Sequence, residues 1–437
     1  MKRSYDTSKA WYERAKKSLS AGVSSQFRVA KPHPMFYERA EGPWLWDVDG
    51  NKLLDFTLAQ GPMILGHSEP RVLDAIQDAM SRGQLFAGQH EQEVLLAEML
   101  CETIPSAERI RFSSTGSEAD HAVIRMARHA TKKQKIIKFE GHYHGWFDEV
   151  AYSVNPTADQ LGDRANPNRV PWSGGLPDGS GDHLIVLPWN DIDAVERAFV
   201  RHRDDIAAVI TEPVMCNQGC IEPQPGFLQG LRNICDEHDA ALIFDEIITG
   251  FRINVGGAQR HYGVTPDLAV FGKALGSGLP ISALVGKARY FDAIESNDVF
   301  HAGTLNSNNI CVAAALSTLS ILLENDEATH HQIVKTGQTL RDRLQALSTI
   351  DNQWHVQGPG PMFHAGFLKE PGPVREYRDV LRYDTEKYGR FVRGLADRGV
   401  RVIGRGLWYV SAAHTAEHLD QVVDAAASTL KEMQTPS

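Results

Sequence analysis

Apolar and polar positions alternate in different ways along the 437-residue chain, and each pattern predicts a different element. After an amphipathic N-terminal helix, the segment FYERAEGPWLWDVDGNKLLDFTL (36–58) alternates apolar and polar residues around Asp49-Gly50. Alternation with period two on both sides of an Asp-Gly pair is typical of an antiparallel hairpin. We therefore expect a small β unit near the start of the chain.

From about Ile110 to Gly286 the pattern changes to short apolar runs separated by helical segments. The runs are RIRF, KIIKF, LIVL, AAVIT, ALIF, LAVF and SALVG. Apolar strands that alternate with amphipathic helices are typical of a mainly parallel sheet wrapped by helices. This part of the chain predicts an α/β fold with a mainly parallel, seven-stranded sheet.

From about Ile321 the chain shows a long helix, a strand near MFHAGFL, another helix, the run LWYVSAAHT and a last helix, AEHLDQVVDAAASTLKEM. These elements predict a smaller α+β domain, built from the C-terminal part together with the N-terminal segment. We expect the limits 1–60 for the N-terminal helix and hairpin, 61–320 for the large domain and 321–437 for the small domain. The irregular segment 153–182 is long for a compact domain, and we interpret it as an active-site flap.

Composition narrows the possible ligands. A formal net charge of −10 and a pI near 6.0 argue against nucleic acid or an anionic membrane as the partner, because phosphate-binding surfaces are basic. A small molecule is therefore the expected ligand. Five scattered cysteines, an N-terminus without an apolar signal region and the absence of an apolar run of about 18 residues predict a reduced, cytoplasmic protein.

Charged residues stand directly after two of the predicted strands. Asp245 and Glu246 follow ALIF, and Lys273 follows LAVF. In open α/β sheets, ligands bind beyond the carboxyl ends of the strands. A single charge at such a position is most often a solvated loop residue, but the three together predict a binding site.

The sequence lacks the complete motifs of several common nucleotide-binding and metal-binding sites. ALIFDE resembles a strand that holds Mg²⁺ in nucleotide hydrolases, yet neither Lys273 nor Lys287 completes a GxxxxGK[ST] loop. No full GxGxxG pattern supports a dinucleotide site either. His142 and His144 in GHYHG supply only two potential ligands, without HExxH or paired CxxC patterns. We therefore expect no metal site.

The residues do fit pyridoxal 5'-phosphate (PLP), which needs a lysine for a Schiff base, an anion at its ring nitrogen, a phosphate cradle and a flat side chain over the ring. Lys273 and Asp245 are the candidates for the first two. The turn in SSTGSEA opens a helix whose N–H groups and dipole favour a dianion, with Gly116 allowing close approach and Ser117 adding a donor. Tyr143 is the candidate stacking residue. The alternatives are a plain helix cap made by Ser117 and simple packing by Tyr143.

At this point several motifs resemble one family across nearly the whole chain. They are STGSEA, GHYHGW, TEPVMCN, FDEIITGFR, the lysine segment GGAQRHYGVTPDLAVFGKALGSGLP and HAGTLNSN, all in the order of the family. The chain resembles a fold type I, class III aminotransferase, and is most similar to the branch that holds glutamate-1-semialdehyde 2,1-aminomutase and D-phenylglycine aminotransferase.

The resemblance implies further site residues. Thr115 belongs to the phosphate turn, Ile247 packs on the ring face opposite the stacking tyrosine, and Glu212 and Asn217 lie near the phenolic side of the cofactor. Thr304, in HAGT, binds the phosphate of the neighbouring subunit's cofactor. This last role implies a homodimer with shared active sites.

The resemblance also suggests how substrate is held. GVSSQFR places Ser25 and Arg28 where the family binds a substrate carboxylate, a task that suits the bidentate arginine side chain. Two positions differ from the aminomutases, because Gln60 replaces a tryptophan and Gly406 replaces a glutamate. Arg405 is either a second carboxylate contact or a salt-bridged surface residue, and we slightly favour the latter.

We therefore expect a PLP-dependent aminotransferase that moves an amino group from a carboxylate-bearing amino acid to a 2-oxo acid by a ping-pong mechanism through Lys273. The donor is expected to be a β-amino acid, or an unusual or D-configured α-amino acid. The same cofactor residues would serve an aminomutase or an amino-acid racemase, so these reactions remain alternatives.

Overall fold

The computed structural model describes residues 3–434 and confirms the expected α/β class. Its largest sheet has seven strands in the order β4-β12-β11-β10-β9-β5-β8, and only β12 runs antiparallel to its neighbours. Each of the seven apolar runs in the sequence forms one of these strands. The strands are β4 (Arg109–Ser113), β5 (Lys135–Phe139), β8 (Leu184–Leu187), β9 (Ile206–Thr211), β10 (Ala241–Asp245), β11 (Leu268–Phe271) and β12 (Ser282–Gly286).

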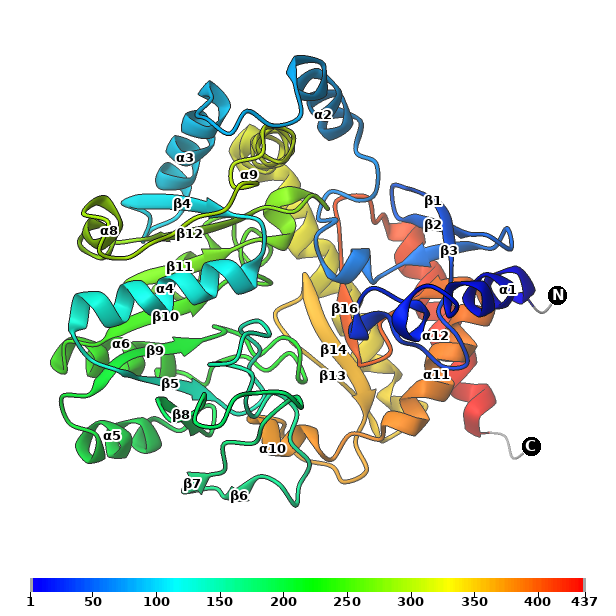
Figure 1. Ribbon diagram of the computed structural model, residues 1–437. Coiled ribbons are helices and arrows are strands. Elements are labelled where there is room, and N and C mark those ends of the chain that lie inside the picture. The colour runs from blue at the N-terminus through cyan, green and yellow to red at the C-terminus, as the bar shows by residue number, and fades with distance from the viewer. Residues whose placement is uncertain (1–2, 435–437) are drawn as a thin grey trace.

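Helices cover both faces of this sheet (Figure 1). Buried residues of α4 and α8 pack with alternate strand residues on one face, and those of α3, α5, α6 and α9 pack on the other. The helices of this part are α2 (Pro70–Arg82), α3 (Glu91–Thr103), α4 (Gly116–Thr131), α5 (Ile192–Arg201), α6 (Phe227–Glu237), α7 (Gly257–Tyr262), α8 (Ala288–Glu295) and α9 (Asn309–Gln345).

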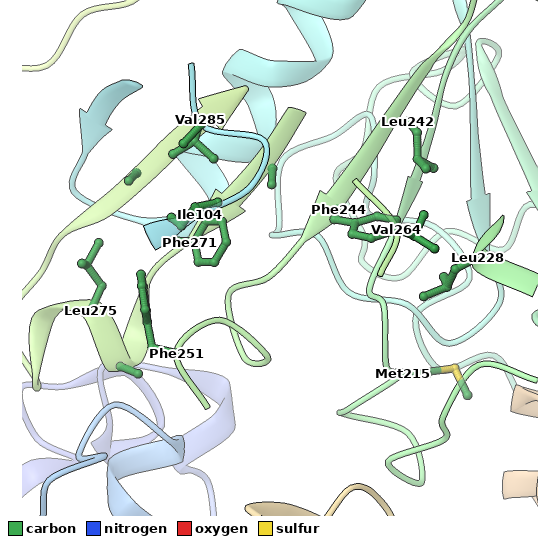
Figure 2. Close-up of a cluster of buried hydrophobic side chains, with 14 of the residues drawn as sticks. Ile104, Met215, Leu228, Leu242, Phe244, Phe251, Val264, Phe271, Leu275 and Val285 are labelled. Atoms are coloured by element: carbon green, nitrogen blue, oxygen red, sulfur yellow. The ribbon is translucent and has the colours of Figure 1, made fainter. Parts of the chain in front are cut away.

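Buried side chains fix the strand ends on which the site is built. Along β10, Ala241 and Ile243 face the α4 side while Leu242 and Phe244 face the opposite core. Figure 2 shows Phe244 from β10 and Phe271 from β11 among their apolar neighbours. The polar residues that follow these two strands are therefore anchored by fully buried aromatic rings.

The second part of the molecule joins both ends of the chain, as expected. Strand β15 pairs in parallel with β3, so the N-terminal meander and the C-terminal segment share one sheet, β1-β2-β3-β15. The expected hairpin around Asp49-Gly50 is the β2–β3 connection, and a second turn at Gly42-Pro43 joins β1 to β2. Another sheet has the order β13-β14-β16.

The elements of this part have the following bounds. The strands are β1 (Tyr37–Glu41), β2 (Trp44–Asp47), β3 (Lys52–Asp55), β13 (Trp354–Gln357), β14 (Met362–Phe367), β15 (Val400–Arg401) and β16 (Leu407–Tyr409), and the helices are α1 (Asp6–Ala15), α10 (Tyr377–Val380), α11 (Thr385–Asp397) and α12 (Ala416–Gln434). Short 3-10 helices are η1 (Ser20–Gly22), η2 (Gln26–Arg28), η3 (Leu58–Gln60), η4 (Lys273–Gly276) and η5 (Ala346–Thr349).

The expected domain limits stay a prediction. Helix α9 runs through the limit at 320/321, and its backbone leaves the helical conformation only at residues 324–327. The segment 153–182 holds one small ribbon, β6 (Gly162–Asp163) with β7 (Asn166–Pro167), and is otherwise irregular. No helix within residues 3–434 is long and apolar enough to cross a membrane.

Candidate active site

A cavity of about 180 Å³ lies beyond the carboxyl ends of the parallel strands. Segments that follow β4, β5, β9, β10 and β11 meet there, as the strand order requires. The cavity is lined by Gly116, Ser117, Asp120, Tyr143, Gly145, Glu212, Cys216, Asn217, Asp245, Ile247, Ile248, Thr249 and Lys273. Eight of the residues expected from the sequence are among these.

Lys273 begins η4 two residues after β11, and its backbone has a φ of 42°. This left-handed conformation is unfavourable for a side chain with a Cβ, and such strain is concentrated at functional sites. Burial lowers the pKa of the amine, although Asp245 and Glu212 oppose this shift. The amine of Lys273 therefore loses its proton more readily than it would in water, and the neutral amine is the nucleophilic form.

Asp245 is the last residue of β10, and its carboxyl is held in place by two hydrogen bonds. His144 Nδ1 donates to Oδ2 at 2.8 Å, and the Ile247 backbone N–H donates to Oδ1 at 3.1 Å. Burial lowers the pKa of His144, so its ring is a neutral donor to the carboxylate. From the sequence, this histidine was a candidate only for metal binding, because a contact between residues 144 and 245, 101 positions apart, leaves no local pattern.

The turn before α4 provides an unobstructed helix N-terminus. Thr115 is the N-cap, because its side chain accepts from the Glu118 N–H, while the Glu118 carboxylate accepts from the N–H groups of Ser114 and Thr115. The alternative in which Ser117 caps the helix is therefore wrong, and the Ser117 side chain lines the cavity instead. Thr115 itself is exposed and does not line the cavity.

Position 116 favours glycine because of the neighbouring Ile247 side chain, and not because of the backbone conformation at 116. A Cβ at this position would lie 2.7 Å from Ile247 Cδ1. The absence of a side chain lets Ile247 pack against the first turn of α4 and line the cavity. A flat ligand bound there would contact this isoleucine.

Glu212 follows β9 and connects two other parts of the site. Its Oε1 accepts from the Tyr143 N–H at 2.8 Å, and its Oε2 accepts from the Cys216 N–H at 3.1 Å. Burial, followed by the negative charge of Asp245, raises the pKa of Glu212 to about 8. Burial also raises the pKa of Tyr143, so this ring stays neutral.

Phe27, Trp172 and Arg405 contact residues that line the cavity, and we call this group of three side chains the entrance. The rings of Phe27 and Trp172 both contact Tyr143, with centroids 5.8 and 5.6 Å away. Arg405 stacks over Phe27 and donates from Nη2 to Asn217 Oδ1 at 3.3 Å. Trp172 belongs to the segment 153–182, which therefore borders the site.

Arg405 is not the salt-bridged surface residue that the sequence analysis slightly favoured. Its side chain is half-buried, its Nε atom is buried without a hydrogen-bond partner, and it has no ion pair within residues 3–434. Burial lowers the pKa of its guanidinium, which nevertheless stays cationic. An unpaired, half-buried cation beside the cavity is suited to binding an anionic ligand.

The other expected residues lie outside the cavity lining. Arg28 is exposed and has no ion pair within the described residues, and Ser25 precedes it in the same loop. Gln60 ends η3, and its Oε1 atom is buried without a partner. Thr304 is exposed in the loop before α9.

The family model for class III aminotransferases matches residues 26–427. The chain belongs to this family. It is 40% identical over 425 residues to a glutamate-1-semialdehyde 2,1-aminomutase of Methanothrix thermoacetophila, covering 96% of this chain and 95% of that protein. Its fold matches an omega-transaminase from Sphaerobacter thermophilus with a TM-score of 0.90 at 31% identity, covering 98% of both chains. A β-phenylalanine aminotransferase from Variovorax paradoxus matches with a TM-score of 0.85 at 29% identity, covering 97% and 93% of the two chains.

The protein is therefore a fold type I, PLP-dependent enzyme of the transaminase class, and PLP is its cofactor. The residues of the cavity fit this group. A lysine and an anchored aspartate share a cavity with a helix N-terminus, which is suited to a phosphate group. The cofactor and the enzyme class expected from the sequence are confirmed.

Proposed function

We propose that the enzyme transfers an amino group from a carboxylate-bearing amino acid, either a β-amino acid or an unusual or D-configured α-amino acid, to a 2-oxo acid by a ping-pong mechanism. The observation that supports this proposal is Arg405, an unpaired cation next to the cavity. A transaminase must bind the donor and the acceptor in turn, and both carry a carboxylate that an arginine can hold.

Gly406 supports a transaminase rather than an aminomutase. The resemblance to the aminomutases implies a glutamate at this position in those enzymes. Here the backbone has a φ of 98°, and a Cβ would lie 2.2 Å from His364 Nε2 and 2.8 Å from Ala365 O. A side chain therefore has no room at 406, and no carboxylate within residues 3–434 forms an ion pair with Arg405.

When bound, PLP supplies an aldehyde that takes up the amino group and a ring that accepts electrons from the substrate. Lys273 would hold it covalently and then, as a free amine, move a proton at the substrate carbon. Asp245, held by His144, would keep the ring nitrogen protonated. The N-terminus of α4 with Ser117 would bind the phosphate, and Tyr143 and Ile247 would contact the ring.

We also propose that the enzyme is a homodimer in which Thr304 contacts the partner's cofactor. The loop that carries Thr304 is tied to the α2–α3 connection, because His90 Nε2 donates to Ser307 O at 2.9 Å and Asn308 Nδ2 donates to Gln84 O at 3.0 Å. Large apolar side chains are exposed on these segments, as expected for a subunit interface. They are Leu73, Met80, Leu85, Phe86, Val94, Leu95, Phe300 and Leu305. Sedimentation equilibrium tests this proposal, and a monomer at assay concentrations would contradict it.

The proposed location is the cytoplasm. Its support is that all five cysteines are unpaired thiols, which is usual in a reducing compartment.

The deciding experiment is a panel of α- and β-amino acids of both configurations, each assayed with pyruvate and with 2-oxoglutarate. We expect a keto acid to form from the donor only when an acceptor is present, and the pyridoxal form of the cofactor to be consumed once per site when it is absent. Failure of every donor to yield a keto acid would contradict the proposal.

An aminomutase remains the second candidate, and the 40% identity to a glutamate-1-semialdehyde 2,1-aminomutase favours it. A racemase would use the same residues. Either enzyme would turn over repeatedly without an added 2-oxo acid. Multiple turnovers of glutamate-1-semialdehyde, or of a single enantiomer of an amino acid, without acceptor would therefore replace the proposed function.

A further inference from the structure

Asp120 is a buried acid in the cofactor cavity to which neither the sequence motifs nor the proposed chemistry gives a role. It lies on α4 three residues after Ser117, and therefore on the helix face that lines the cavity. Its side chain is only 1% exposed. Asp245 continues the side of β10 that packs on α4, so the two carboxyls face the same space between helix and sheet.

The two aspartates differ in their hydrogen bonds. Asp245 accepts from His144 and from the Ile247 N–H. Asp120 Oδ1 is buried without a partner, and the Asp120 side chain has no ion pair with any residue between 3 and 434. A buried carboxyl that no protein group satisfies is costly, so its retention points to a ligand.

The charges around the cavity indicate the protonation state of Asp120. The groups that face it are Asp245 after β10, Glu212 after β9, Lys273 after β11 and the neutral Tyr143 after β5. When carboxyls share a buried site, those with few donors favour the protonated form. Asp120 Oδ1 accepts no hydrogen bond, and the pKa of Asp120 is raised first by burial and then by Asp245 and Glu212.

We propose that Asp120 contacts PLP as a neutral carboxylic acid and donates a hydrogen bond to one of the anionic oxygens of the cofactor, while Asp245 serves the ring nitrogen. This inference rests on PLP as the cofactor, but not on the substrate or the reaction. Asp120 then serves cofactor binding at the expense of the stability of the cofactor-free fold.

The test measures PLP affinity and thermal unfolding of the cofactor-free full-length protein, without substrate. Asp120→Asn keeps the shape of the side chain and a hydrogen-bond donor but cannot carry a charge. Asp120→Ala removes both the shape and the donor. We expect Asp120→Asn to retain PLP affinity within about threefold and Asp120→Ala to lose roughly tenfold, as for one hydrogen bond. Because the unsatisfied acid is gone, the unfolding midpoint of cofactor-free Asp120→Ala should equal or exceed that of the wild type.

A matched control is Asp267→Asn, which changes another fully buried aspartate. Asp267 is satisfied by Arg232, Lys287 and the Leu242 N–H and does not line the cavity. We expect this variant to lower the unfolding midpoint and to leave PLP affinity unchanged.

Three outcomes would overturn the proposal. Unchanged PLP affinity in Asp120→Ala would show that Asp120 does not contact the cofactor. Equal losses in Asp120→Asn and Asp120→Ala would mean that a negative charge is needed. A lower midpoint in cofactor-free Asp120→Ala would make the residue structural. Because no substrate is used, these results stand whether or not the proposed transamination is found.

Discussion

The cofactor cavity and the entrance beside it are built in different ways. Asp245 ends a buried strand, and Glu212 and Lys273 each follow one within two residues, so their positions are set by the sheet. Phe27 of η2 and the loop residues Trp172 and Arg405 come from three distant segments and meet only through tertiary packing. The residues proposed to hold the cofactor are therefore positioned by strand ends, whereas those proposed to contact substrate lie on segments that can change without disturbing the fold.

The largest effect is expected from Lys273→Ala. The variant lacks the amine that we propose holds PLP covalently and moves the proton, so transamination should fall below detection and the visible absorbance of the lysine-bound cofactor should disappear. Lys369→Ala is the control, because Lys369 is exposed and does not line the cavity. Retained transamination in Lys273→Ala would refute the assignment of the cavity.

Asp245→Asn should come next. The variant keeps the size of the side chain but removes the charge that His144 orients at 2.8 Å. Loss of one preorganised electrostatic contact typically lowers kcat by roughly 10² to 10³. Single-turnover kinetics of amino transfer would measure this effect, and a kcat within about threefold of the wild type would show that the ring nitrogen is held by another group.

The entrance is tested by comparing two arginines. Arg405→Gln should raise KM for carboxylate substrates by roughly ten- to a hundredfold, the worth of a charged hydrogen bond, with a smaller change in kcat. Arg28→Gln should change KM by less than about threefold, because exposed charges contribute little. A larger increase in KM for Arg28→Gln than for Arg405→Gln would support the carboxylate-binding role that the family resemblance gives to Arg28.

The sequence predicted most of the cavity because its residues are tied to local patterns. The seven apolar runs became strands, and Asp245 and Lys273 lie together because parallel strands end at one edge of the sheet. Glu246, the third predicted charge, does not line the cavity, because its carboxylate accepts from the Thr249 hydroxyl and the Ala258 N–H. The contact of His144 with Asp245 and the half-buried state of Arg405 depend on residues about a hundred or more positions apart. No pattern of periodicity or spacing encodes such contacts, so they required the structure.

The smallest predicted effect is a pH dependence of stability that comes from Glu212 in the cavity and not from Arg405 in the entrance. The pKa of Glu212 is about 8 in the folded protein, against an ordinary value of 4.5. Between these values the folded state keeps a proton on Glu212 that the unfolded chain releases, so the contribution of Glu212 to the free energy of unfolding of the cofactor-free protein should fall as pH rises, by about 2 kcal/mol between pH 6 and 8. Urea unfolding at both pH values should give the same change in the wild type and in Arg405→Gln, whereas the change in Glu212→Gln should differ from it by this amount. An equal change in Glu212→Gln would mean that another buried group of the cavity carries the proton.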